Sequence, residues 1–275
     1  MTYAFQGRGA LDYFPCRYGK SKILFRGPKK DLTKDYIAFI GGTETYGRFI
    51  EKPFPNLVEE ATGVTAVNFG CMNAGIDVFK SEPSILRACS AAKATVIQVM
   101  GAQNMSNRFY SVHPRRNDRF IRSSTLMKTI FREVDFTEFN FNRHMLMTLQ
   151  TLSPERFEVV REELREAWSA RMRTLVDAID GPIILLWLAN HTPDDDENGA
   201  GLGPDPLFIN RAMIEALRPK VAEVIEVSCE MDGSEQSTDG MVFSPMEVTA
   251  AHAMLGVKAH GKAADALTTP LKAVV

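Results

Sequence analysis

The chain has 275 residues, of which 45% are hydrophobic and 24% are charged. That balance is typical of an ordinary globular protein large enough to bury a core. Its 32 Lys and Arg against 34 Asp and Glu give a net charge of -2, so no basic surplus favours nucleic acid or an acidic membrane. No run reaches the roughly 18 apolar residues that a membrane helix needs, and no signal-peptide core opens the sequence. We therefore expect a cytoplasmic protein with neither nucleic acid nor membrane among its partners.

Cysteine and histidine usage argues against a metal site. Four cysteines are scattered without any CxxC pair: Cys16, Cys71, Cys89 and Cys229. This pattern excludes a zinc ribbon and a dense disulfide framework, and buried reduced thiols are the simpler interpretation. His144 and His260 make no metal-ligand spacing with each other. We expect no metal and find no recognisable cofactor-binding signature.

Short apolar runs alternate with helical patterns from residue 36 onward, as in a parallel sheet with crossover helices. The five expected strands are Tyr36–Ile40, Thr65–Phe69, Ala94–Met100, Pro182–Leu188 and Val221–Val227. Continuous apolar runs of this kind suit strands that are buried on both faces. Without repeats or linkers, the chain is expected to form a single α/β domain over residues 1–275, with residues 1–34 as an N-terminal extension wrapped on it.

The clearest helix begins at Ser153, an N-cap residue followed by proline at the first helical position. An apolar stripe with spacings of three and four then runs from Phe157 to Ile179, which predicts one amphipathic face. Before this helix, residues 101–152 form a long insertion after the third strand. Ser124–Phe131 and Phe139–Leu152 predict helices there, and hence a helical cap beside the sheet.

Small and polar residues follow the first three expected strands. In open α/β sheets, ligands bind beyond the carboxyl ends of the strands. The loops 41–47, 68–75 and 101–108 therefore predict a polar pocket formed by Thr43, Asn73, Gln103 and Asn104. Free N–H groups after the two glycines of the first loop would favour an oxyanion or a phosphate. Each loop alone is also compatible with an ordinary turn.

Four short blocks resemble those of the SGNH (GDSL) hydrolase family in order, spacing and strand context. They are GGTETYG at 41–47, VNFG at 67–70, GAQN at 101–104 and DGMV at 239–242. The resemblance implies a three-layer, flavodoxin-like fold with a five-stranded parallel sheet. It also implies an oxyanion-hole N–H from Gly70 and a second donor from Gln103, or from Asn104 after a one-residue shift. The whole sequence further resembles an alphaproteobacterial family that shares the GGTETYG and MGAQNMSNRFY segments, which supports the fold and implies no function.

The departures from the SGNH pattern affect its catalytic side chains. Thr43 stands where the family has its nucleophilic serine, Gly42 replaces the preceding aspartate, and Val242 takes the place of the catalytic histidine. A hydroxyl nucleophile needs a nearby base, so the standard serine esterase mechanism is disfavoured. His252 could substitute only if the fold brings it to the site.

The insertion contains five arginines within 15 residues, interleaved with aromatic residues and His113: Arg108, Arg115, Arg116, Arg119 and Arg122. The planar guanidinium group suits carboxylate, phosphate or sulfate, so one hypothesis is an anion-binding rim. The other is a solvated basic turn, or pairing with the acidic stretch 133–138. Asp118 could also be an internal partner for one arginine.

The acidic loop 194–205 partly matches a calcium-binding EF-hand loop. Asp194, Asp196 and Asn198 have the right spacing, and Asp205 falls at the twelfth position, where a glutamate is usual. A strand rather than a helix precedes the loop. A solvated acidic loop is therefore favoured, and calcium binding stays open.

Two functions follow from these patterns. The first is a noncanonical transferase or hydrolase acting on an anionic or carbohydrate-like small molecule. Thr43, Gln103, Asn104 and His113 would be its catalytic residues, with His113 as acid or base. Its substrate-binding residues would be Gly42, Glu44, Gly70, Asn73, Arg108, Arg115, Arg116 and Arg119. The second is a noncatalytic carbohydrate-binding or structural module of the same fold, and a homo-oligomer is possible in either case.

Overall fold

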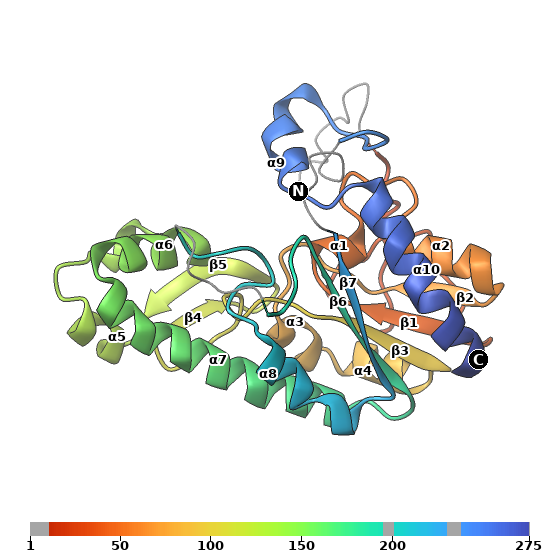
Figure 1. Cartoon of the computed structure of the whole chain (residues 1–275), viewed down its shortest axis with the longest axis horizontal. Helices are drawn as coiled ribbons and strands as arrows, with labels where there is room; N and C mark the ends of the chain where they lie inside the picture. Colours follow the sequence, from red (N-terminus) through yellow and green to blue (C-terminus); the bar gives the residue numbers. More distant parts are fainter. Residues whose placement is uncertain (1–10, 195–200, 230–237, 275) are drawn as a thin grey trace.

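The computed structural model describes residues 11–194, 201–229 and 238–274, and these contain a five-stranded parallel sheet (Figure 1). Its strands are β1 (Tyr36–Ile40), β2 (Thr65–Asn68), β3 (Ala94–Gln98), β6 (Ile183–Ala189) and β7 (Glu223–Ser228). They are arranged in the order β2-β1-β3-β6-β7. Counting only these strands, this is the 2-1-3-4-5 order of flavodoxin-like folds. The α/β class and the five-stranded parallel sheet are confirmed.

The sheet is covered by helices on both faces, which explains why its central strands are apolar along their whole length. Every residue of β1, β3 and β6 is buried. On one face, Ile37 and Phe39 pack with α2 (Phe54–Thr62) and α10 (Val257–Val274). On the other face, Ala38 and Ile40 belong to a core that includes residues of α3 (Ile76–Lys80), α4 (Pro83–Ser90) and α7 (Pro154–Asp177). The result is a three-layer arrangement.

The long helix α7 begins as the sequence predicts. The Ser153 hydroxyl accepts a hydrogen bond from the Arg156 N–H (3.4 Å), and proline occupies the first turn. The predicted stripe from Phe157 onward is buried. Within it, the indole N–H of Trp168 donates to the Met100 carbonyl (2.7 Å), which ties the helix to the end of β3.

The insertion lies beside the sheet and contains more than the expected helices (Figure 1). It includes α5 (Thr125–Ile130), η1 (Phe136–Glu138) and α6 (Asn142–Leu152), close to the predicted positions. It also contains an antiparallel hairpin of β4 (Tyr110–His113) and β5 (Arg116–Ser123), which the sequence did not predict. Register shifts on either side of Val112 interrupt the two-residue alternation that marks a strand.

The described part of the N-terminal extension packs on the domain. Tyr18 and Phe25 contact Phe69 edge-on, with ring centroids 5.0 and 5.4 Å away. The buried guanidinium group of Arg26 donates to the carbonyls of Gly47 (2.6 Å) and Glu51 (2.7 Å). This extension therefore holds the backbone that follows α1 (Thr43–Tyr46).

The remaining short elements connect these parts. They are α8 (Arg211–Glu215), η2 (Arg218–Lys220), η3 (Pro245–Glu247) and α9 (Val248–His252). None of the four cysteines, which all lie in the described ranges, forms a disulfide. Among the helices of the described ranges, none combines the length and apolar character needed to span a bilayer.

Candidate functional site

A cavity of about 560 Å³ lies at the carboxyl ends of the sheet strands. Loops that follow β1, β2, β3 and β6 line it, together with residues 253–255 after α9. Strand order reverses beside β1, which is where ligands bind in doubly wound sheets. The polar side chains that line the cavity are Thr43, Glu44, Asn73, Gln98, Gln103, Asn104, Arg143, Asn190 and Asp205.

Gln98 at the end of β3 organises the glycine loop that follows β1. Its Oε1 accepts hydrogen bonds from the N–H groups of Gly42 (3.1 Å) and Thr45 (3.1 Å) and from the Thr45 hydroxyl (2.6 Å). We expected free N–H groups in this loop, and this expectation is wrong for these two. Because a buried N–H without a partner is costly, the side chain of Gln98 fixes the loop in place of an external anion.

The Thr43 hydroxyl is held by the loop that follows β2. Its Oγ1 accepts from the Asn73 N–H (3.0 Å) and donates to Asn73 Oδ1 (3.3 Å). Asn73 has a left-handed backbone with φ 54°, and its Nδ2 donates to Asp118 in the hairpin (3.3 Å). No histidine of the described residues lines the cavity, so Thr43 has no imidazole base there. His252 is exposed and outside the lining.

Gln103 and Asn104 lie in the cavity wall as the sequence predicts, and both are at least nine-tenths buried. Gln103 Nε2 donates to Asp205 Oδ1 (3.0 Å), while Gln103 Oε1 has no hydrogen-bond partner among the described atoms. Asn104 Nδ2 donates to the Asn73 carbonyl (3.1 Å), and its Oδ1 accepts from Asn142 of α6 (3.2 Å). Asn104 thus links three segments structurally, and Gln103 carries a buried acceptor without a partner in the described contacts.

Two carboxyl groups face this cavity in different environments. Asp205 Oδ2 accepts from the Arg143 guanidinium group (2.7 Å), so both Asp205 oxygens have donors. Glu44 is partly buried and accepts from the Leu255 N–H. Burial, and then the nearby charge of Asp205, raise the pKa of Glu44 from its ordinary value of 4.5 to about 7, although the Leu255 bond opposes this change. Glu44 can therefore exchange a proton at neutral pH.

Gly70 does not line the cavity, contrary to the expectation that its N–H contributes to an oxyanion hole. That N–H donates to Asn68 Oδ1 (2.8 Å), and Asn68 Nδ2 donates to the Thr45 carbonyl (2.6 Å). A Cβ at Gly70 would overlap with the backbone of Thr45 and Tyr46. Gly70 is therefore needed for close packing against α1.

The arginine-rich segment also lies outside the cavity lining. Arg108 pairs with Glu163 of α7 (2.5 Å), and the Arg119 guanidinium group lies over the Phe141 ring at 4.8 Å. The side chains of Arg115 and Arg116 are exposed at the hairpin turn, and the backbone N–H groups of both residues donate to His113 Nδ1 (3.2 Å each). These side chains therefore do not form the expected rim of the described cavity, and His113 caps a turn.

The acidic stretch 133–138 does not pair with these arginines in the described contacts. Glu133 instead binds Arg156 of α7, at 2.5 and 3.2 Å.

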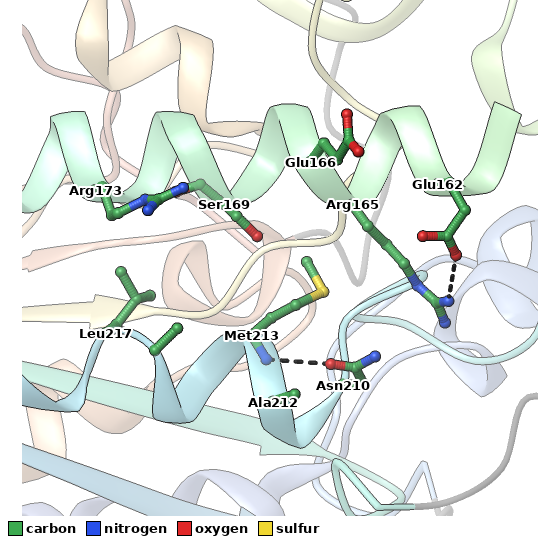
Figure 2. Close-up of a pocket in the computed structure, with 10 residues that line it drawn as sticks. Glu162, Arg165, Glu166, Ser169, Arg173, Asn210, Ala212, Met213 and Leu217 are labelled. Carbon is green, nitrogen blue, oxygen red and sulfur yellow. Dashed lines mark hydrogen bonds and ion pairs between the residues drawn. The ribbon is translucent and has the colours of Figure 1, made fainter. Parts of the chain in front are cut away.

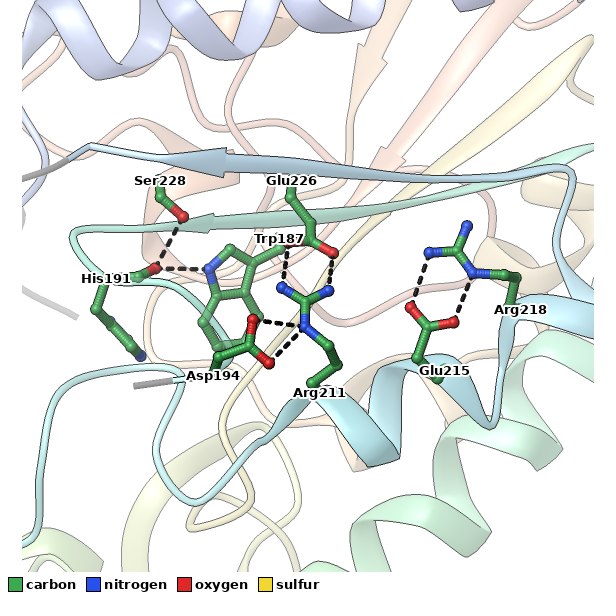
Figure 3. A network of polar contacts seen from close by, with 8 residues as sticks. All are labelled: Trp187, His191, Asp194, Arg211, Glu215, Arg218, Glu226 and Ser228. Carbon is green, nitrogen blue, oxygen red and sulfur yellow. Dashed lines mark hydrogen bonds and ion pairs between the residues drawn. The ribbon is translucent and has the colours of Figure 1, made fainter. Parts of the chain in front are cut away.

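The loop that carries Asp205 is anchored at both ends by a polar network (Figure 3). Arg211 binds Asp194 through Nε (2.6 Å) and Glu226 of β7 through both Nη atoms (2.5 and 2.8 Å). The His191 carbonyl accepts from Trp187 Nε1 (2.9 Å) and from Ser228 (3.1 Å). Because Asp194 and Asp205 bind different guanidinium groups, they do not act as joint calcium ligands in this arrangement.

The middle of the proposed calcium loop, including Asp196 and Asn198, lies outside the described residues. Over residues 11–194, 201–229 and 238–274, no three His, Cys, Asp or Glu side chains are grouped to hold a metal ion.

A second hollow, of about 460 Å³, lies between α7 and α8 (Figure 2). Several of its polar side chains are engaged with each other or with the helices. Arg165 pairs with Glu162 (3.0 Å), and Asn210 Oδ1 caps α8 at the Met213 N–H (3.1 Å). This groove is lined by α7, α8 and the residues that flank α8, whereas the cavity at the strand ends gathers polar side chains from several loops of the sheet, so that cavity is the better candidate site.

Sequence reasoning missed several residues of the cavity. Gln98 had a signal, since it is the polar residue in the apolar strand ATVIQ. Asp205 was considered only as a calcium ligand, and Arg143 and Asn190 had no local pattern. These residues reach the site through long-range packing: Arg143 and Asp205 are 62 positions apart.

Comparisons with known proteins provide no activity for the chain. The crystal structure of the lipase Lip_vut3 from a goat rumen metagenome is similar to this chain with a TM-score of 0.42 and 10% identity. The match covers 86% of this chain and 97% of the lipase chain. No curated protein matches the sequence. One family matches residues 1–275, and the chain therefore belongs to the family described as Domain of unknown function (DUF6473).

Proposed function

We propose that the chain is a noncanonical hydrolase or transferase that acts on a carbohydrate-like substrate in the cavity at the strand ends. The observation that carries this proposal is the convergence of Thr43, Glu44 and Gln103, with Asp205, on one cavity. Its volume of about 560 Å³ is within the range of about 300–1,000 Å³ that is typical of ligand sites. Hydroxyl, amide and carboxyl groups suit the many hydroxyl groups of a sugar, which both donate and accept.

The charges of the cavity favour a neutral sugar over an anionic ligand. Arg143 is the basic residue of the described lining, and Asp205 neutralises it at 2.7 Å. Glu44 adds negative charge when it is ionised. A phosphate or sulfate group would meet these carboxylates, while the exposed arginines of the hairpin lie outside the described lining. The carbohydrate-like part of the original expectation is therefore the better supported part.

The chemistry would differ from that of the SGNH hydrolases that the sequence blocks resemble. In that family a serine attacks with the help of a histidine. Here the Thr43 hydroxyl is hydrogen-bonded to Asn73, and Val242 stands at the histidine position. The Gly70 N–H, which would be an oxyanion donor in that family, is hydrogen-bonded to Asn68. Catalysis would therefore have to use side chains other than a Ser-His pair.

Ligand-dependent thermal stability tests the substrate class. Neutral oligosaccharides should raise the melting temperature, because a ligand at 100 times its Kd stabilises the folded state by about 2.7 kcal/mol. Sugar phosphates should give a smaller shift. Gln103→Ala should lose the shift, and Ser169→Ala in the α7–α8 groove should keep it. A shift from sugar phosphates alone would contradict the proposed substrate class.

The second candidate is a noncatalytic carbohydrate-binding module of the same fold. It is favoured by the way Gln98 and Asn68 already satisfy N–H groups that could otherwise stabilise an oxyanion. Both candidates predict sugar binding. Mass spectrometry after prolonged incubation separates them, since only an enzyme converts the bound oligosaccharide or its ester into products.

A further inference from the structure

We infer that Glu44 is the acid–base group of this cavity and that Asp205 is the neighbouring carboxyl group that adjusts its proton affinity. This inference rests on the proposed function, since a proton-transfer role requires that the cavity performs hydrolysis or transfer. It replaces the expected role of His113, which lies outside the cavity lining.

The position of Glu44 suits this role. It follows Thr43 in α1 and lines the same cavity as Asn73, Gln103 and Asp205. Its carboxyl group accepts one backbone hydrogen bond, from Leu255. Glu44 is therefore oriented from one side, and it keeps capacity to accept a bond from water or from a substrate hydroxyl.

Asp205 is held differently, and the contrast assigns the roles. One of its oxygens accepts from Gln103 Nε2 (3.0 Å) and the other from Arg143 Nη1 (2.7 Å). Both oxygens of Asp205 are therefore engaged, whereas Glu44 in the same cavity accepts the single bond from Leu255. Paired carboxyl groups in unequal environments are typical of acid–base sites.

The charged groups around Glu44 can be named from the described lining. They are Asp205 and Arg143, while residues 253–255 after α9 contribute no charged side chain. Burial and Asp205 together raise the pKa of Glu44 to about 7. A general acid or base is most effective when its pKa lies near the working pH, so the carboxyl group has the right proton affinity for its position.

Gln103 is a second polar residue of the cavity lining whose hydrogen bonds are incomplete in the described contacts. Gln103 is 8% exposed, and its Oε1 is a buried acceptor without a partner among the described atoms. Such an atom costs free energy unless a donor reaches it. A ligand hydroxyl that donated to Oε1 after a small movement of the side chain would lie in the same cavity as Glu44.

The proton balance of a hydrolysis is complete with these groups. As the oxygen of a water molecule bonds to the carbonyl carbon of a substrate ester, the carbonyl oxygen becomes an oxyanion, one O–H bond of the water breaks and the proton moves to ionised Glu44. The oxyanion then re-forms the carbonyl group as the bond to the leaving oxygen breaks, and the leaving oxygen takes the proton from Glu44. Water and ester become a carboxylic acid and an alcohol, and Glu44 returns to its ionised state.

The test combines a titration with a turnover assay. In protein labelled with ¹³C at the glutamate carboxyl groups, the resonance that disappears in Glu44→Gln should titrate with a midpoint near 7. Turnover is followed with 4-nitrophenyl acetate and 4-nitrophenyl β-D-glucopyranoside. The rate should rise with pH through the same midpoint. It should fall at least about 100-fold in Glu44→Gln and stay unchanged in Glu138→Gln, an exposed glutamate of the insertion.

The Asp205→Asn variant distinguishes an acid–base role of Glu44 from a purely structural one, because a structural role would leave the pH profile of turnover unchanged. Removing the opposing charge should shift both the titration midpoint and the pH profile to lower pH. Turnover that persists in Glu44→Gln would overturn the role of Glu44 and leave the proposed enzyme function intact. A wild-type protein that binds neutral oligosaccharides but turns over neither probe would overturn both.

Discussion

The cavity at the strand ends and the β4–β5 hairpin are neighbours, joined by the hydrogen bond between Asn73 and Asp118, yet their polar residues are arranged in opposite ways. In the cavity, Gln103 bonds to Asp205 across 102 positions of the chain. In the hairpin, His113 bonds to backbone N–H groups two and three positions away. Polar residues that converge from distant segments therefore mark the candidate site better than polar residues that are dense in one segment.

The two regions also differ in burial, which sets the cost of changing them. Gln103 and Asn104 are 8% and 9% exposed, so lost hydrogen bonds there leave buried groups without partners. Arg115 and Arg116 are exposed, and solvent screens their charges. Substitutions that affect the cavity should therefore change stability and binding far more than substitutions in the hairpin.

The largest effect on stability is expected from Gly75→Ala. This substitution tests whether the cavity wall is as tightly packed as the contrast with the hairpin implies. Gly75 precedes α3, and its N–H donates to Asn117 in the hairpin (3.1 Å). An added Cβ would overlap with the carbonyl oxygen of Asn104, so the cavity wall would have to move. Overpacking of this kind should lower the free energy of unfolding by about 3 kcal/mol, as measured by urea denaturation.

Gly261→Ala in α10 is the matched control. A Cβ there meets no heavy atom within 4 Å, and alanine is the better helix former. The free energy of unfolding should rise by roughly 0.5–1 kcal/mol. Equal effects of the two substitutions would show that the close approach of Gly75 and Asn104 is not tightly packed.

The same contrast explains what the sequence could and could not predict. Local patterns were sufficient for the sheet strands and for α7, because burial on both faces and an N-cap with proline are properties of contiguous residues. The glycine and amide loops could be placed at one edge because parallel strands end together. Asp205 and Arg143 could not be placed in the cavity from the sequence, since their positions depend on how the loop after β6 and helix α6 pack across it.

The hairpin was missed for a related reason. Its strands are short, and the register shifts beside Val112 break the alternation of buried and exposed residues. Five arginines within 15 residues then suggested an anion-binding rim, but none of them lines the described cavity. Composition suggested a chemistry, but only the tertiary structure shows which side chains share a space.

An intermediate effect is expected from the pH dependence of stability. The pKa of Glu44 is about 7 in the folded protein and about 4.5 when the group is unperturbed. The folded state therefore binds the proton more tightly. The stability from protonated Glu44 is complete below about pH 4.5 and is lost as the pH rises through 7.

Glu44→Gln removes this dependence. Between pH 5 and pH 8, the free energy of unfolding of the wild type should fall relative to that of Glu44→Gln by roughly 2 kcal/mol. Urea denaturation at both pH values measures the difference, and Glu138→Gln is the control on an exposed carboxyl group. A wild type that follows the Glu44→Gln curve would mean that Glu44 is as well solvated as a surface residue, and that the cavity and the hairpin differ less than proposed.

The smallest effect is expected from the double substitution of Arg115 and Arg116 by alanine. Both side chains are exposed at the hairpin turn and outside the described cavity lining, so the free energy of unfolding should change by less than about 0.5 kcal/mol. Titration calorimetry with a neutral oligosaccharide should give the wild-type Kd, whereas Gln103→Ala should weaken binding in the same assay. Loss of binding in the arginine variant would contradict the distinction between a binding cavity and a solvated hairpin. It would mean that the hairpin folds over the ligand, and that the cluster of arginines in the sequence had indicated the site after all.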